Sequence, residues 1–158
     1  MGVVADAVLG AGGHVIGVIP GFLLRREIVH TGVTDLRVVE SMHERKALMA
    51  DLADAFIALP GGIGTFEETF EAMTWTQLGL QDKPIALLDV AGFWAPVLAL
   101  LDRAVLDQFL SADVRASIMH GTSATAMLDH FASWERPPVG KLIDLQPPRD
   151  SETKTEVL

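Results

Sequence analysis

Short apolar segments alternate along the chain with longer segments in which apolar positions recur at helical spacing. The short segments predict β-strands at His14–Ile19, Asp35–Val39, Ala55–Leu59 and Ile85–Asp89. The longer ones predict helices at Gly2–Gly10, Ser41–Leu52, Thr65–Leu78, Trp94–Phe109 and Ala124–Trp134. Val15–Ile19 and Ile85–Leu88 are apolar without interruption, as expected of strands covered on both faces. This order predicts an α/β protein with a Rossmann-like parallel sheet and helices on both of its faces.

Residues 1–136 are expected to form a single Rossmann-like nucleotide-binding domain. From Arg136 onward Pro, Lys, Glu, Asp and Thr dominate, which predicts a flexible C-terminal tail over residues 137–158. The chain opens inside the first predicted helix, with no strand or glycine loop before it. In a doubly wound sheet that piece would hold a central strand, so we expect the fold to be truncated at its N-terminus.

Composition narrows the classes of partner. The chain carries 21 acidic and 12 basic residues, a net charge of -9, which excludes the basic footprint of nucleic-acid binding. A phosphate-bearing small molecule remains compatible, because backbone amides can supply local positive potential. The lack of cysteine excludes disulfides, thiolate catalysis and cysteine-ligated metals. With no membrane-length apolar run and no secretory pattern, we expect a cytoplasmic protein without membrane contact.

The densest motif is Leu59-Pro60-Gly61-Gly62-Ile63-Gly64-Thr65-Phe66-Glu67-Glu68, where a predicted strand passes into a helix. Ligands of open α/β sheets bind at such strand ends. Three glycines in four positions let backbone amides approach a ligand, and the helix start offers unpaired N–H groups to an anion. The motif predicts a phosphate site, although glycines also serve tight turns that bind nothing.

Three carboxylates follow the glycines on one side of the helix: Glu67, Glu68 and Glu71. Like charges at these spacings cost roughly 0.2–0.5 kcal/mol per pair, which favours a functional reason for gathering them. They could accept hydrogen bonds from ribose hydroxyls or orient a water, and Thr74 shares the face of Glu67 and Glu71. The alternative for Glu68 is a capping box, Thr65-x-x-Glu68, with a purely structural role.

Further candidates precede the glycine motif. Arg45 falls near the centre of the apolar face of the helix Ser41–Leu52, so it needs an acid or an anion. It could pair with the Glu67/Glu68/Glu71 group, or it could extend its stem to solvent or form a structural ion pair. Lys46 could serve a phosphate or simply lie at the surface, whereas His43 and Glu44 are expected to be only solvated. Glu27 follows a predicted strand, from which a loop could reach the same crevice.

The remaining polar and aromatic residues suggest no second site. His14, His30, His120 and His130 lack the spacing of a metal site, so no metal is expected. The tryptophans are expected to be core or interface anchors, with Trp75 a possible exception because it follows Thr74.

The run from Glu27 through Arg45-Lys46 to Pro60-Gly61-Gly62-Ile63-Gly64-Thr65-Phe66-Glu67-Glu68 resembles the LOG ("lonely guy") family of cytokinin riboside 5′-monophosphate phosphoribohydrolases. Proteins of this family were formerly described as lysine decarboxylases. The resemblance covers Met1 to about Trp134 and implies that Arg45 and Glu68 are the catalytic pair. It also implies that the nucleotide site is lined by Glu27, Lys46, Gly61, Gly62, Ile63, Gly64, Thr65, Glu67 and Thr74, to which the charge pattern adds Glu71.

The family implies Rossmann-like homodimers or larger homo-oligomers that use no metal or organic cofactor. Its members usually begin with a strand, a helix, a second strand and a glycine loop ending in Gly-Leu-Met-Gly. Met1-Gly2 resembles the end of that loop, so part of the phosphate site is expected to be missing from this chain.

The implied reaction is hydrolysis of the N-glycosidic bond of an N6-prenylated adenosine 5′-monophosphate, which releases a cytokinin base and ribose 5-phosphate. Glu68, helped by Glu67, suits the positive charge at the anomeric carbon. Arg45 suits the departing base or holds the carboxylate in place. One alternative is a non-catalytic nucleotide-binding or sensor module. A lysine decarboxylase, which would need pyridoxal phosphate on a lysine, is disfavoured because no lysine has a convincing context.

Overall fold

The computed structural model describes residues 1–24, 30 and 32–134. Along the chain its elements are α1 (Gly2–Gly10), β1 (Ile16–Pro20), β2 (Asp35–Val39), α2 (Met42–Leu52), β3 (Phe56–Ala58), α3 (Ile63–Gln77), β4 (Ile85–Leu88), α4 (Ala95–Leu106), α5 (Ala112–Ser117), β5 (Ile118–Gly121) and α6 (Ala124–Ala132). They form two compact units, Met1–Asp54 and a second that begins at Ala55.

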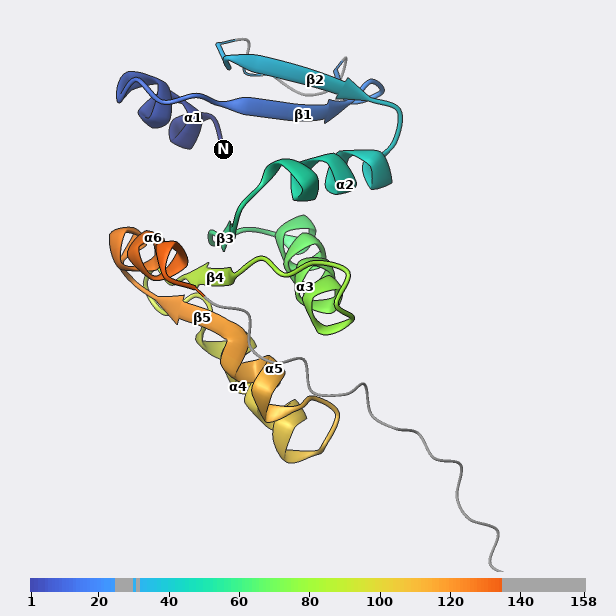
Figure 1. The fold of residues 1–158 in the computed structure, drawn as a ribbon, viewed down its shortest axis with the longest axis vertical. Coiled ribbons are helices and arrows are strands. Elements are labelled where there is room, and N and C mark those ends of the chain that lie inside the picture. The colour runs from blue at the N-terminus through green and yellow to red at the C-terminus, as the bar shows by residue number, and fades with distance from the viewer. Residues whose placement is uncertain (25–29, 31, 135–158) are drawn as a thin grey trace, which may run out of the picture. The chain divides into compact units, whose positions relative to one another are not determined.

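The first unit is a parallel pair of strands with helices beside it (Figure 1). β1 and β2 pair in register from Ile16↔Asp35 to Pro20↔Val39, and α2 packs against both strands. α1 ends at Gly10 with Ala11 as its C-cap, and Gly12 follows in the left-handed region (φ 78°), a conformation that favours glycine after a helix. Neither helix buries a residue completely, and the first unit has little core of its own.

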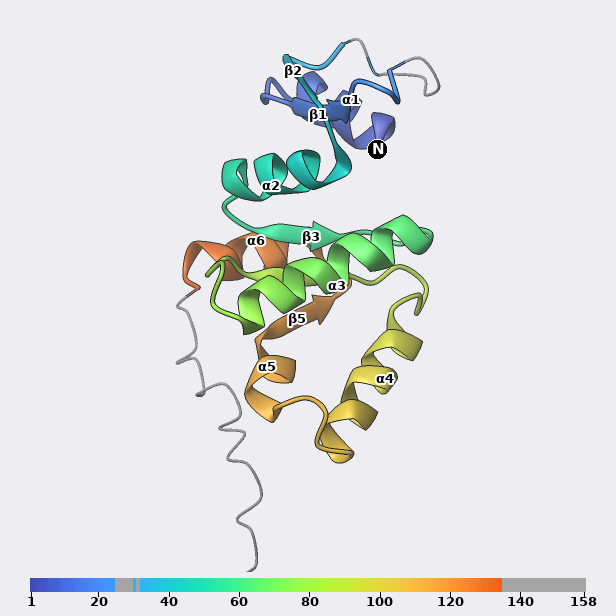
Figure 2. The ribbon, with the colours of Figure 1, turned by 90° about the vertical axis from the view of Figure 1, so that its right-hand side faces the viewer.

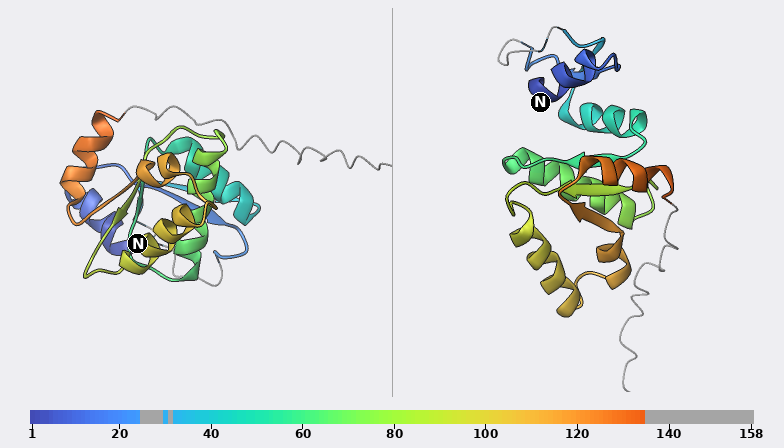
Figure 3. Two further views of the ribbon diagram at one scale, coloured as in Figure 1. Left: turned by 90° about the horizontal axis from the view of Figure 1, so that it is seen from below. Right: turned by 90° about the vertical axis from the view of Figure 1, so that its left-hand side faces the viewer.

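The second unit is a three-layer arrangement around a parallel sheet in the order β3-β4-β5. Strand pairing runs from Phe56↔Ile85 and from Ile85↔Ile118. α3 and α6 lie on opposite faces of this sheet (Figures 2 and 3). Side chains of α3, α4 and one face of β4 form the main core, which includes Met73, Leu87 and Leu101. Because the strands are parallel, their carboxyl ends meet at one edge, where the glycine motif begins.

The predicted α/β class with parallel strands and flanking helices is confirmed, and all four predicted strands form within two residues of their expected bounds. β5 and α5 were not predicted, because each is short and Ile118–Gly121 includes a polar histidine. The expected tail, residues 137–158, lies outside the described residues, and the single domain over residues 1–136 stays a prediction. No helix in the described part of the chain is both long enough and apolar enough to span a membrane.

Candidate active site at the carboxyl edge of β3

The glycine motif links β3 to α3. β3 ends at Ala58, and α3 begins at Ile63 with Gly62 as its N-cap, in an extended conformation (φ -89°, ψ -161°). Gly62 has no side chain to cap the helix, so the first-turn N–H groups are not engaged by a cap residue. The loop therefore presents a helix start at the sheet edge where ligands of parallel α/β proteins bind.

The three motif glycines differ in what surrounds them. A Cβ on Gly61 would overlap Thr65 Oγ1 and come within 2.9 Å of Thr65 Cβ, so the packing of Thr65 itself requires glycine there. A Cβ on Gly62 or Gly64 would meet nothing within 4 Å. Neither has a positive φ, so no backbone strain explains these two glycines. The open space is what close approach of a ligand to the backbone would require.

The alternative for Glu68, a capping box with Thr65 as the N-cap, does not fit the start of α3, whose N-cap is Gly62. Thr65 is the third residue of α3, because the helix begins two residues earlier than predicted. A related arrangement occurs at α2, where the N-cap Ser41 Oγ accepts the Glu44 N–H at 3.1 Å and Glu44 Oε2 accepts the N–H of Glu40, the residue before the N-cap, at 2.8 Å. Glu44 is thus a capping residue rather than only solvated.

The carboxylates and Thr74 follow one another along α3. Glu67 is exposed, whereas Glu68 and Glu71 are half-buried. Thr74 is exposed and its hydroxyl donates to the Phe70 carbonyl at 2.7 Å, so its oxygen can act toward a ligand mainly as an acceptor. Half-burial makes Glu68 better shielded from water than Glu67 for work on a developing charge.

Aromatic rings hold the start of α3 in place, a feature that the sequence did not reveal. Phe66 stacks on Phe93 with ring centroids 5.9 Å apart and meets Trp94 edge-on at 5.8 Å. Trp94 is fully buried, which confirms it as a core anchor. Trp75 and Trp134 are half-buried. The signal in the sequence was the aromatic pair Phe93-Trp94 a few residues after β4, together with the aromatic Phe66 of the motif.

Arg45 and Lys46 lie in the first unit, on α2, and both are half-buried. The Arg45 Nε donates to the Val18 carbonyl of β1 at 3.3 Å, so its side chain turns inward as expected. The expected partners Glu67, Glu68 and Glu71 belong to the second unit, and the pairing stays a prediction. Glu27 lies outside the described residues.

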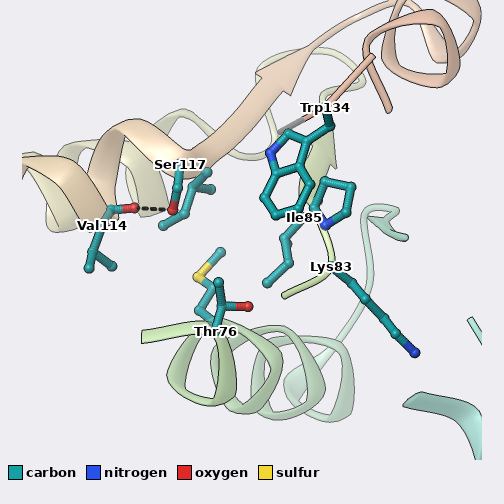
Figure 4. A pocket seen from close by; sticks show the side chains of 9 residues that line it. Thr76, Lys83, Ile85, Val114, Ser117 and Trp134 are labelled. Atoms are coloured by element: carbon teal, nitrogen blue, oxygen red, sulfur yellow. Dashed lines mark hydrogen bonds between the residues drawn. The ribbon is translucent and has the colours of Figure 1, made fainter. Parts of the chain in front are cut away.

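A small enclosed space in the second unit lies at the other end of the sheet. A cavity of about 10 Å³ is lined by side chains that include Thr76, Ile85 and Trp134, near the amino ends of β4 and β5 (Figure 4). Ser117 Oγ donates to the Val114 carbonyl at its rim at 2.7 Å, and Lys83 points away from it. A nucleotide needs a site of several hundred Å³, so this cavity cannot hold one.

A wider groove of about 730 Å³ runs beside β5 and α6, with Arg115, His120 and His130 among its lining residues. It is separate from the glycine motif. In the described part of the chain no group of three or more His, Asp or Glu residues could hold a metal ion.

A protein-family model described as "Possible lysine decarboxylase" matches residues 1–131. The chain belongs to this family. Among its relatives is "Cytokinin riboside 5'-monophosphate phosphoribohydrolase LOG" of Oryza sativa subsp. japonica, 50% identical over 128 residues, which are 81% of this chain and 53% of the relative. The LOG1 protein of the same description from Arabidopsis thaliana is 48% identical over 128 residues, 81% of this chain and 60% of the relative.

The probable rice phosphoribohydrolase LOGL1 is 46% identical over 136 residues, 86% of this chain and 61% of the relative. These matches confirm the resemblance to the LOG family that the motif suggested. The chain spans between about half and two thirds of the length of these relatives.

Proposed function

We propose that this protein hydrolyses the N-glycosidic bond of N6-prenylated adenosine 5′-monophosphate, releasing the free cytokinin base and ribose 5-phosphate. The observation that carries the proposal is the loop at the start of α3, where a Cβ on Gly62 or Gly64 would meet nothing within 4 Å and which leads directly into Glu67 and Glu68. The names of the relatives, which are phosphoribohydrolases of cytokinin riboside 5′-monophosphates, supply the substrate class.

In this mechanism the amides of the loop hold the 5′-phosphate, since a helix start favours an anion. Glu68, which is half-buried on the next turn, accepts hydrogen bonds from the ribose hydroxyls. Its negative charge stabilises the positive charge that develops at C1′. Water adds to C1′ as the bond to the base breaks, and the proton that the water loses is transferred to the departing base. Arg45 stabilises the negative charge on the departing base or orients Glu68, and Glu67, Glu71 and Thr74 bind ribose.

The test is incubation of the purified protein with adenosine 5′-monophosphate and its N6-isopentenyl derivative, with base release followed by chromatography. Release of base and ribose 5-phosphate in equal amounts is expected. Binding of either nucleotide without release would favour the non-catalytic sensor instead. An absorbance band of a pyridoxal Schiff base in the purified protein, with lysine consumed in place of nucleotide, would favour the decarboxylase chemistry that the family description names.

We further propose a homodimer or larger homo-oligomer in the cytoplasm. Exposed apolar side chains in the first unit support an apolar contact surface, among them Val3, Val4 and Val38. A nucleotide substrate and a sequence without cysteine suit the cytoplasm. Light scattering over a range of protein concentrations tests the oligomer.

A further inference from the structure

We propose that the groove beside β5 is a second binding site, which takes a small hydroxylated molecule with one oxyanion group, either a phosphate monoester or a carboxylate. The groove measures about 730 Å³, and Arg115, His120 and His130 are among the residues that line it. This volume lies in the range of small-molecule sites. All of the lining residues lie between Asp113 and Trp134, outside the glycine motif, so the site does not depend on the reaction proposed above.

The groove runs along the outer edge of β5. This strand is hydrogen-bonded to β4, and among the described strands it has no neighbour on its other side. Successive residues of a strand point to opposite faces of a sheet, yet Ile118, Met119 and His120 all line the groove. Space that is reached from both faces passes around the open edge of the strand. A ligand there can therefore contact side chains of the helices on either side of β5 in the sequence, α5 and α6.

The groove gathers the cationic and imidazole side chains of an acidic region. Between Ala55 and Trp134 the sequence has two histidines, His120 and His130, and both line the groove. Arg115 is one of only three lysines and arginines in that range, where acidic residues outnumber them. Neither imidazole forms a hydrogen bond with a residue that the structure describes. Even a neutral imidazole carries one N–H donor, so both rings can donate to an oxyanion.

Arg115 is held in position to bind an anion. Its side chain is 17% exposed, and its Nε donates to Asp102 Oδ1 of α4 at 2.7 Å. A guanidinium has five N–H donors, and one carboxylate accepts from at most two of them in a bidentate pair. Donors therefore remain for a second acceptor. Because Asp102 already fixes the orientation of the guanidinium, little further ordering of the side chain is needed when a ligand binds.

The other polar groups of the groove favour a ligand that also carries hydroxyl groups. Ser117 Oγ donates to the Val114 carbonyl at 2.7 Å, and Ser133 Oγ donates to the His130 carbonyl at 3.2 Å. Because their protons are engaged, both oxygens act toward a ligand as acceptors, as does the carboxylate of Asp113. Acceptors repel an oxyanion but receive hydrogen bonds from hydroxyls. The groove thus combines donors for an oxyanion with acceptors that suit the hydroxylated part of the same molecule.

The experiment follows the imidazole signals of His120 and His130 by NMR while ribose 5-phosphate, gluconate or uncharged ribose is added to the full chain. Ribose 5-phosphate or gluconate should shift both signals in a saturable way, and ribose should not. Which of the two anions binds distinguishes the phosphate from the carboxylate. Arg115→Gln should weaken this binding by at least about tenfold, because charge-assisted hydrogen bonds are lost. Arg103→Gln is the matched control, since Arg103 pairs with Asp107 on α4 and does not line the groove.

The absence of shifts with both anions up to about 10 mM would overturn the inference. Equal shifts with ribose would overturn it too, because the oxyanion would then be unnecessary. So would shifts that persist in Arg115→Gln but disappear in Gly62→Ala, because the anion would then bind at the glycine loop. If circular dichroism shows that Arg115→Gln does not fold, His130→Gln at an exposed position decides instead, with an expected loss of affinity of at least about threefold.

Discussion

The two units carry different parts of the predicted site, and they differ in how many apolar residues they bury. Among the residues that the structure describes, Pro20 and Val39 are the buried apolar residues of the first unit, and the other buried hydrophobic residues belong to the second. In the second unit, the side chains of Leu87, Trp94 and Met127 are almost completely buried. The first leaves Val3 82% exposed and Val38 54% exposed.

The difference shows that sequence hydrophobicity and achieved burial are separate properties. α1 is among the most apolar segments of the chain and yet buries no residue, because nothing in its own unit covers both of its sides. Burial contributes about 25 cal/mol per Å² of apolar surface removed from water, so stability follows the covered area rather than the composition. We infer that the glycine loop stands on a self-sufficient scaffold, whereas Arg45 and Lys46 stand on one that needs further contacts.

The largest expected effect is on the stability of the second unit. Trp94→Ala should lower the free energy of unfolding by about 3–5 kcal/mol, because it removes a fully buried ring and two aromatic contacts. For comparison, Val38→Ala at an exposed strand position of the first unit should lower the free energy of unfolding by less than about 0.5 kcal/mol. Urea denaturation monitored by circular dichroism measures both. Equal costs would contradict the contrast between the units.

The next largest expected effect is the loss of turnover when one candidate catalytic residue of each unit is replaced. Glu68→Gln and Arg45→Ala should each reduce kcat by about 100- to 1,000-fold, since each removes a charge that acts in the transition state. Circular dichroism should show an intact fold in both variants. Glu44→Gln is the control, because its side chain caps α2 and touches no proposed substrate group. Near-normal turnover in Arg45→Ala would assign Arg45 a structural role, to which its hydrogen bond with the Val18 carbonyl contributes.

A paired glycine substitution separates folding from binding within the motif. Gly61→Ala should destabilise the protein by about 1–3 kcal/mol, because the new Cβ overlaps Thr65. Gly62→Ala meets open space and should change stability by no more than about 1 kcal/mol at this N-cap. It should nevertheless weaken nucleotide binding measured by calorimetry. An unchanged affinity in Gly62→Ala would show that the phosphate binds elsewhere.

The smallest effect is a difference in local opening. Amides of β1 and β2 should exchange with solvent through openings of lower free energy than those of β4, whose Ala86 and Leu87 are completely buried. Hydrogen exchange followed by mass spectrometry resolves the two regions. Addition of nucleotide should slow exchange in the peptide that contains residues 59–66. Equal protection of β1 and β4 without nucleotide would mean that the first unit is covered as well as the second.

The sequence by itself determined the α/β class, the parallel strands and the place of the glycine loop. These follow from local patterns: the period of apolar positions, the glycine that stops α1 and the Gly-rich junction after β3. The position of the main candidate residues on α2 and α3 was equally readable, because an amphipathic helix assigns its residues to faces.

Only the tertiary structure decided the rest. A Ser/Thr-x-x-Glu pattern is present at both Ser41 and Thr65. Where each helix begins depends on what packs around it, and Ser41 is the N-cap of α2 whereas Thr65 lies inside α3. Sequence likewise could not show that Thr65 excludes a Cβ at Gly61, or that Phe93 stacks on Phe66 from another loop. Such contacts either join residues that are distant in sequence or depend on the rotamer of one side chain. They therefore cannot be predicted from a local sequence pattern.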